Sequence, residues 1–289
     1  MPPVGHARAH LPFLCEIGAR VADVVIRAHR GPAPERGEGE LLFSSARLWR
    51  LTRGRGGREL TVLAPHLGGE VHAQAWIPEG PEPVPPHVDL WLNPPPGGFG
   101  DRLPALDYPL DELLFGQLLA RGLGLIVHST AVRVRGRGLL FPGTSGVGKS
   151  TLSQVLIDAS DRGKMQEEES GIAGLEVLSD DRNVVRIIDG VPWVFGTPWH
   201  GDVDKVAGGG APLERILFLE HAEKNRFRAI GGAEAAATLM ARSFPPYWDP
   251  EQLDQAAELV ERIVELCPPM RFGFVPDRGV VGALGLEEG

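Results

Sequence analysis

A glycine-rich segment at residues 143–150 carries the clearest chemistry in the sequence. It reads Gly-Thr-Ser-Gly-Val-Gly-Lys-Ser and matches the pattern G-x-x-x-x-G-K-[ST] at every fixed position. Glycines allow the backbone N–H groups of such a loop to turn inward around a phosphate, and a helix that starts there adds partial positive charge. An apolar run precedes the segment and a helical pattern follows it. The segment therefore predicts a binding site for a nucleoside triphosphate.

The residues of this segment have distinct expected roles. Lys149 is predicted to reach the β- and γ-phosphates, and the Ser150 hydroxyl is predicted to coordinate magnesium. The chain has four lysines among its 29 basic residues, so a lysine here indicates a need for a compact ammonium group. We expect ATP and Mg²⁺ as the bound species. The predicted nucleotide-binding residues are Gly143, Thr144, Ser145, Gly146, Val147, Gly148, Lys149, Ser150 and Thr151.

A pair of acidic residues follows about 30 residues after this segment. The mostly apolar run 175–178 ends in Ser179, Asp180 and Asp181. Two carboxylates beside a magnesium ion can divide the work, one holding the metal and the other accepting the proton of an attacking hydroxyl. An Asp-Asp pair on its own is typical of a solvated strand end. Its position behind a phosphate loop favours the catalytic interpretation.

Two histidines are candidates for the same site. His128 lies 15 residues before Gly143, and two antiparallel strands would fold it back beside the loop, although spacing alone favours a structural histidine at a strand end. His200 lies in the segment 196–202, after a predicted strand. That segment is predicted to bind an acceptor or sense the γ-phosphate, and an aromatic-capped turn with an exposed histidine is the alternative. The glycine run 208–210 could be a flap or a linker.

The elements that must position these residues alternate between strands and helices. This alternation predicts an α/β core. A proline- and glycine-rich run at 94–98 places a domain boundary near residue 100. The expected helices are 107–121, 149–159, 233–243 and 250–266, the last with Asp249 at its N-cap. The expected strands are 123–127, 131–134, 139–141, 176–178, 184–188, 191–195, 216–219 and 272–275.

The first hundred residues have a different pattern. Short β-like runs predict a smaller β-rich domain over residues 1–100, in front of a domain over residues 101–289. The runs are 13–26, 41–51, 60–64, 71–77 and 88–92.

Composition excludes several classes of protein. The 289 residues are 43% hydrophobic and carry a net charge of −9, which argues against binding along a nucleic-acid backbone. No apolar run approaches the roughly 18 residues of a membrane span, so we expect no membrane partner and a cytoplasmic location. The two cysteines are far apart and no Cys/His group has zinc spacing.

In order and spacing, His128, the segment 143–150 and the run 178–182 resemble the HPr kinase/phosphorylase family, which shares a P-loop core with the phosphoenolpyruvate carboxykinases. The resemblance covers residues from about 107 to 245. It implies that Asp180 is the candidate base, Asp181 the metal ligand and His128 their neighbour, with the division between the two aspartates open. It also implies a possible homo-oligomer.

Two features mark this chain as a divergent relative. Thr151 stands where the family commonly has Glu, and the segment 196–202 resembles a divergent group whose members include kinases acting on peptide or small-molecule hydroxyls. The predicted function is therefore an ATP- and Mg-dependent kinase that transfers the γ-phosphoryl group to a hydroxyl of a protein, peptide or metabolite. The alternatives are a carboxykinase-like phosphoryl transfer and a nucleotide-sensing regulatory protein with little turnover.

Overall fold

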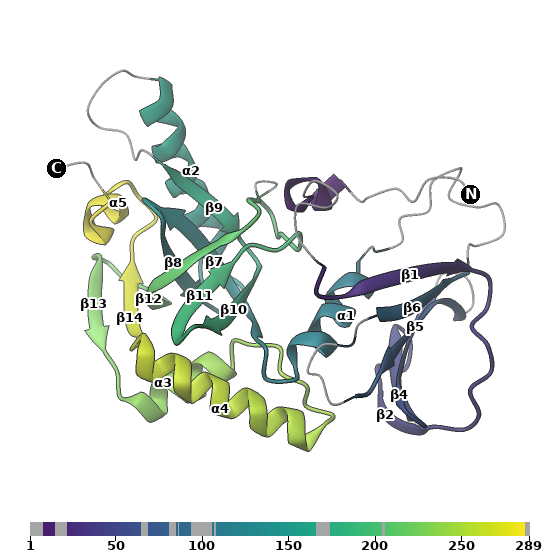
Figure 1. The fold of residues 1–289 in the computed structure, drawn as a ribbon. Coiled ribbons are helices and arrows are strands. Elements are labelled where there is room, and N and C mark those ends of the chain that lie inside the picture. Colours follow the sequence, from purple (N-terminus) through teal and green to yellow (C-terminus); the bar gives the residue numbers. More distant parts are fainter. Residues whose placement is uncertain are drawn as a thin grey trace. The chain divides into compact units, whose positions relative to one another are not determined.

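A computed structural model divides the chain into two compact units (Figure 1). The first unit is Met1–Arg121 with Pro246–Glu251, and the second is Gly122–Pro245 with Gln252–Gly289. The predicted boundary near residue 100 falls in 94–105, outside the described residues, and the units divide after Arg121. The structure describes residues 8–14, 22–64, 69–80, 85, 87–93, 106, 108–165, 174–203 and 206–286.

The first unit is built on one six-stranded sheet, and a short 3₁₀ helix, η1 (Arg8–Phe13), precedes it. The strand order is β1-β6-β5-β4-β3-β2, with β1 and β6 parallel and the other pairs antiparallel. The predicted β-like run at 13–26 is wrong where it is described, because strand structure begins only at Val25. The strands are β1 (Val25–Arg30), β2 (Glu40–Ser44), β3 (Trp49–Gly54), β4 (Gly57–Ala64), β5 (Glu70–Pro78) and β6 (His87–Leu92).

Alternating side chains give this sheet two different faces. One face packs on α1 (Leu110–Leu119) in an apolar core that includes Leu51, Leu60 and Leu114. The leucines of α1 that enter this core explain why residues 108–121 belong to the first unit. The residues in between, such as Thr52, Glu59, Gln74 and Trp76, lie on the opposite face.

The second unit contains an eight-stranded sheet whose strand order includes a closed ring. The order is β11-β10-β7-β8-β12-β14-β13, β9 pairs with β7, and β11 also pairs with β12. Its strands are β7 (Leu125–Val134), β8 (Arg137–Pro142), β9 (Leu175–Ser179), β10 (Arg182–Ile188), β11 (Val191–Phe195), β12 (Gly210–His221), β13 (Arg226–Ala229) and β14 (Met270–Phe274).

Two predictions about this sheet need correction. The separate strands expected at 123–127 and 131–134 form the single strand β7, because β10 and β9 follow each other along one edge and β8 pairs with residues 129–134 on the other. The glycine run 208–210 is neither a flap nor a linker. Gly209 accepts a backbone hydrogen bond from Gly196, and Gly210 pairs with Phe195 at the start of β12.

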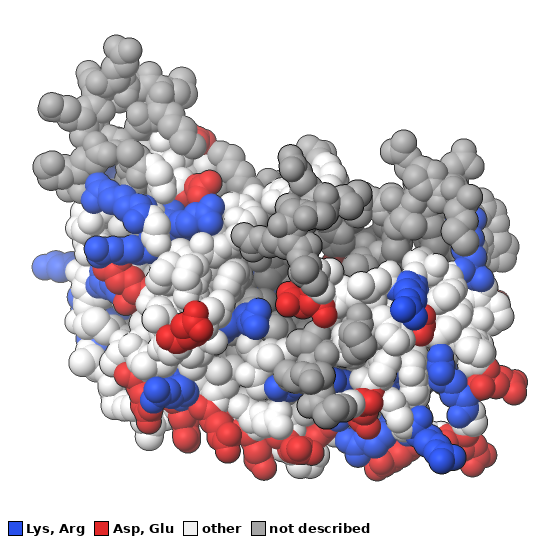
Figure 2. All heavy atoms as spheres, viewed as in Figure 1, with Lys and Arg blue, Asp and Glu red and all other residues white. Residues whose placement is uncertain are grey.

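Helices cover both faces of the second sheet. One apolar core joins the sheet to α2 (Lys149–Met165) and α5 (Gly279–Leu284), and the other joins it to α3 (Gly232–Met240) and α4 (Pro250–Leu266). The predicted α/β class is therefore confirmed. The outer face of α4 is acidic, as Figure 2 shows along the edge where Figure 1 draws this helix. Among the described residues, no helix has the length and apolar character needed to cross a bilayer.

The residue just before α4 belongs to a buried ion pair of the first unit. Asp249 occupies the predicted N-cap position, and its Oδ2 accepts hydrogen bonds from Arg58 at 2.6 Å and Arg53 at 3.3 Å. Asp249 is 3% exposed. Removing one partner of a buried pair leaves the other charge without compensation, which is costly.

We expect the Asp249→Asn variant to lower the free energy of unfolding by about 3 kcal/mol, because the buried Arg58 guanidinium would lose the closer of its carboxylate partners and keep only the more exposed Glu79. Urea-unfolding midpoints would measure this. Glu40→Gln is the matched control, since its pair with Arg53 at 3.7 Å is exposed and its loss should cost no more than about 0.5 kcal/mol. Equal losses of stability in the two variants would contradict the conclusion that the buried Asp249 pair contributes more to stability than the exposed Glu40 pair.

Candidate nucleotide and phosphoryl-transfer site

Strand β7 brings the predicted site residues together through backbone hydrogen bonds on both edges. On one edge, the Gly143 N–H donates to the His128 carbonyl at 3.2 Å. On the other edge, the Ser129 N–H donates to the Asp181 carbonyl at 2.9 Å. The glycine-rich loop, the histidine and the acidic pair, which are far apart in sequence, are therefore neighbours across one strand. His128 lies inside β7 and not at a strand end, which corrects that alternative.

The loop between β8 and α2 has a backbone that only glycine fits at Gly148. This residue has φ of +103°, and a Cβ there would lie 2.9 Å from the Phe274 Cζ. The Leu152 N–H already donates to the Gly148 carbonyl at 2.9 Å, so the first turn of α2 is formed at this point. The loop thus ends directly at a helix N-terminus, where anions bind favourably.

Lys149 is folded back onto the loop. Its ammonium donates to the carbonyl oxygens of Gly143 and Thr144, each at 3.1 Å, and the residue is 7% exposed. Burial lowers the pKa of Lys149, the nearby Arg242 lowers it further, and the carboxylates of the acidic pair act in the opposite direction. The ammonium group is therefore held at the loop by weak neutral acceptors, and a stronger anionic partner could replace them.

Asp180 is buried and held by backbone donors. Its Oδ1 accepts from the Gly201 N–H at 2.7 Å, and its Oδ2 accepts from the Val203 N–H at 3.1 Å. The Ser150 hydroxyl donates to the same Oδ2 at 3.4 Å. With an exposure of 1%, Asp180 is fixed in place by three donors. The contact joins the first residues of α2 to the end of β9.

Asp181 is more exposed and has different partners. His128 Nε2 lies 3.1 Å from Asp181 Oδ1, and Arg182 binds Oδ2. Burial alone would raise the pKa of Asp181, but the hydrogen bond from His128 and the charges of Arg182, His128 and Lys149 outweigh it and lower the pKa. Arg182 in turn lies 5.2 Å from the ring centroid of Phe244, a partly exposed side chain. The Asp181 carboxylate is therefore kept ionised at an accessible edge.

The segment after β11 closes around the acidic pair. The Thr197 hydroxyl donates to the Arg182 carbonyl at 2.5 Å, and the Ser179 hydroxyl donates to the Trp199 carbonyl at 3.0 Å. Trp199 is buried, so its indole supports the loop and is not presented to a ligand. His200 Nδ1 lies 3.2 Å from the carbonyl of Gly201, the residue that donates to Asp180. His200 is thus beside the site, and its predicted catalytic role stays a prediction.

Sequence reasoning missed a buried polar cluster under the site. The Thr130 hydroxyl contacts the Lys149 carbonyl at 3.2 Å, the Ser153 hydroxyl at 3.1 Å and the Asp180 carbonyl at 3.4 Å. The Asn183 amide donates to the Ser129 carbonyl at 2.7 Å. The only sequence signal for this cluster is the polar segment 128–130 between the predicted strands 123–127 and 131–134. These contacts fix the loop, β7 and the acidic pair relative to each other.

The described residues could supply a few of the ligands of a magnesium ion, with water and phosphate supplying the rest. No group of three or more His, Cys, Asp or Glu side chains able to hold a metal occurs in the described part of the chain. Ser150 and Asp180 offer two adjacent oxygens. Magnesium is commonly held by one or two protein oxygens together with water and substrate phosphates, so this donor set suits it.

The comparisons with known proteins add little to this geometry. No protein-family model matches the sequence, and no curated protein matches it. Among solved structures, the Hpr(Ser) kinase/phosphatase from Coxiella burnetii aligns with a TM-score of 0.30 and 14% identity, over 55% of this chain and 93% of that chain. A likeness at this level assigns neither a family nor an activity to the chain.

We expect the Gly148→Ala variant to be less stable than Gly146→Ala. Both glycines have positive φ, which costs an L-residue about 1–2 kcal/mol, but only the Cβ at position 148 would meet Phe274. Overpacking should add about 1–3 kcal/mol to the loss for Gly148→Ala. Urea unfolding of the two variants would measure the difference, and equal losses would show that contact with Phe274 does not constrain the loop.

The lowered pKa of Asp181 predicts a pH dependence of stability. Because the folded state holds this carboxyl below its ordinary pKa, the stabilisation should be complete above the ordinary value near about 4 and should decline as the pH falls through the lower, folded value. NMR titration of the Asp181 carboxyl carbon would report the pKa. In His128→Ala that pKa should rise toward its ordinary value, and an unchanged pKa would contradict the role given to His128.

Proposed function

We propose that the chain is an ATP- and Mg-dependent kinase that transfers the γ-phosphoryl group of ATP to a hydroxyl of a protein, peptide or small molecule. The observation that carries the proposal is the 3.4 Å contact between Ser150, at the start of α2, and Asp180, at the end of β9. It joins a phosphate-binding sequence pattern to an acidic pair in one site. In this proposal the second unit is a P-loop core of the HPr kinase and phosphoenolpyruvate carboxykinase type.

The loop at 143–150 would bind the phosphates of ATP. Its glycine-dependent backbone and the N-terminus of α2 supply inward N–H groups and partial positive charge. Lys149, now bonded to two loop carbonyls, would exchange these neutral acceptors for the β- and γ-phosphate oxygens. This exchange needs only a small movement of the Lys149 side chain within its own loop. It breaks no ion pair, because Lys149 forms none with the described residues.

Ser150 and Asp180 would hold the magnesium ion. Magnesium, when bound, offsets negative charge on the phosphates. Asp180 suits the metal side because its Oδ2 lies beside the Ser150 hydroxyl, the other proposed ligand, and because two backbone N–H groups fix its orientation. Its burial keeps it away from an acceptor. The resemblance implied the opposite division, with Asp180 as the base and Asp181 as the metal ligand, but left the choice between the two aspartates open.

Asp181 would face the acceptor hydroxyl. Its side chain is more exposed than that of Asp180, and His128 and Arg182 fix its orientation. In the transfer, the acceptor oxygen forms a bond to the γ-phosphorus, the bond from that phosphorus to the β,γ-bridging oxygen breaks, and the hydroxyl proton passes to Asp181. A carboxylate of low pKa is a weak base, but phosphoryl transfer depends mainly on positioning and charge stabilisation. His200 remains a candidate on the acceptor side.

The test is transfer of labelled phosphoryl from γ-labelled ATP to candidate acceptors, including proteins and peptides encoded beside this chain, followed by mass spectrometry. We expect Lys149→Ala to abolish transfer, because no other ammonium replaces it in the loop. Asp181→Asn should lower the rate by about 10²–10⁴ while ATP binding is kept. Removal of magnesium with a chelator should stop transfer in the unaltered protein.

Lys224→Ala is the matched control, because Lys224 is exposed on the turn between β12 and β13, outside the site residues. Its activity should equal that of the unaltered protein. Release of inorganic phosphate alone would indicate a hydrolase, and intact bound nucleotide would indicate a sensor. Either result, or unchanged transfer in Lys149→Ala, would contradict the kinase proposal.

A further inference from the structure

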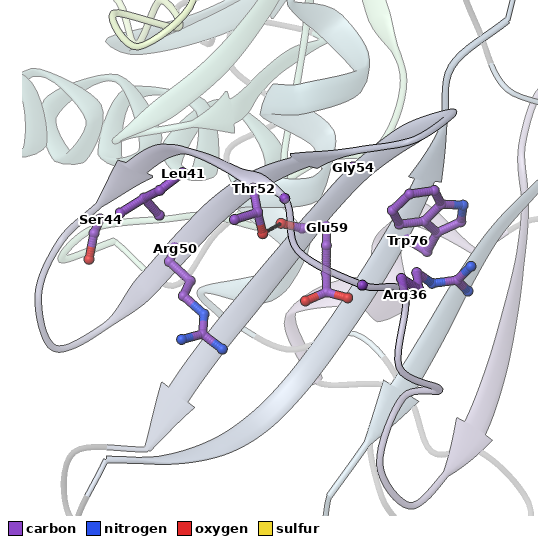
Figure 3. A pocket seen from close by; sticks show the side chains of 10 residues that line it. Arg36, Leu41, Ser44, Arg50, Thr52, Gly54, Glu59 and Trp76 are labelled. Atoms are coloured by element: carbon purple, nitrogen blue, oxygen red, sulfur yellow. Dashed lines mark hydrogen bonds between the residues drawn. The ribbon is translucent and has the colours of Figure 1, made fainter.

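The first unit contains a pocket on the sheet face that is turned away from its core. The pocket has a volume of about 460 Å³ and is lined from β2, β3, β4 and β5 and from the segment before β2 (Figure 3). Small-molecule sites commonly have volumes of about 300–1,000 Å³. None of the residues of the proposed kinase site lines it, so the pocket is a second candidate binding site.

One wall of the pocket is a fixed aromatic surface. The Trp76 indole lies against the hairpin between β3 and β4, because a Cβ at Gly57 would be only 2.6 Å from its Cζ2 atom. The Arg36 guanidinium lies over the same ring, 4.3 Å from its centroid, and 5.1 Å from the centroid of Trp91. These contacts hold an indole and the aliphatic stem of an arginine in place before any ligand arrives.

Two opposite charges line the pocket without pairing with each other. Arg50 pairs in register with Thr61, and Thr52 pairs with Glu59, so Arg50 and Glu59 are diagonal neighbours on one face. Figure 3 shows both side chains projecting to the same side, whereas Arg36 extends along Trp76. Among the described residues, no ion pair joins Arg50 to Glu59, and the Arg50 guanidinium makes no side-chain hydrogen bond. An anion and a cation of a ligand could therefore find separate partners here.

The Glu59 carboxylate is also held in position. Its Oε1 accepts hydrogen bonds from Gln74 Nε2 at 3.2 Å and from the Thr61 hydroxyl at 3.4 Å. Thr52, its neighbour in register, donates from its hydroxyl to the Glu59 carbonyl at 3.4 Å. Both contacts to the carboxylate involve Oε1, which leaves Oε2 as an acceptor for a ligand. Arg50 offers a planar set of donors that suits a carboxylate.

We propose that this pocket binds a free α-amino acid with an apolar or aromatic side chain. The α-carboxylate would pair with Arg50, the α-ammonium with Glu59, and the side chain would lie against Trp76 and the stem of Arg36. A ligand with one charge would leave either Arg50 or Glu59 unpaired, and a neutral ligand would leave both. A zwitterion whose ammonium and carboxylate groups are attached to the same carbon satisfies the two residues together.

Calorimetric titration of the full chain tests this proposal. The probes are L-leucine, L-methionine and L-phenylalanine, each compared with its C-terminal amide and its N-acetyl derivative. We expect at least one free amino acid to bind with a Kd of about 1 mM or lower, and both of its derivatives to bind at least about tenfold more weakly. Failure of all three amino acids at about 10 mM, or equal binding of a derivative, would overturn the proposal.

Substitutions locate the binding. Arg50→Gln and Glu59→Gln should each weaken binding at least about tenfold, because each removes a charge-assisted hydrogen bond. Arg27→Gln, on the exposed strand β1 and outside the pocket lining, is the matched control and should bind as the unaltered protein does.

Circular dichroism would check folding, and Arg50→Lys, which keeps the charge, serves if Arg50→Gln does not fold. Unchanged binding in both folded charge variants would place the ligand elsewhere and overturn the proposal. The kinase assay does not depend on the result.

Discussion

The double pairing of strand β7 is the constraint on which the candidate site depends. One edge of β7 holds the start of the glycine-rich loop through His128, and the other holds the acidic pair through Ser129. Beneath them, the Thr130 hydroxyl contacts both sides. Three consecutive residues of one strand therefore set the separation between the phosphate-binding loop and the carboxylates. A shift of one residue in either register would move these groups to opposite faces.

The charged groups of the site are held mainly by the backbone. Lys149 is bonded to loop carbonyls, and Asp180 is bonded to N–H groups of the segment that follows β11. Neither relies on a flexible side chain for its position, since the Ser150 hydroxyl is only the third donor to Asp180. Asp181 differs, because its partners His128 and Arg182 are side chains. This contrast explains why Asp180 is rigid and buried while Asp181 lies at an accessible edge.

Those parts of the site that depend on local spacing could be predicted from the sequence. The loop at 143–150 and the pair Asp180–Asp181 lie together as expected, since a strand and a helix flank the loop and strands flank the pair. The continuity of β7 was not predictable, because Ser129 and Thr130 look like a polar break until their buried partners are known. The burial of Trp199 and the partners of each aspartate arise from contacts between distant segments, which periodicity does not report.

The first unit depends on a segment from the far end of the chain. Trp248 packs on Phe43 and Trp49, and Asp249 neutralises Arg58, although about 190 residues separate the two ion-paired positions. A polypeptide that ended at Arg121 would lack these contacts, and Arg58 would keep Glu79 as a carboxylate partner but lose Asp249. The amino-terminal unit is therefore not one continuous stretch of the polypeptide, and a single cut in the chain cannot separate it intact from the other unit.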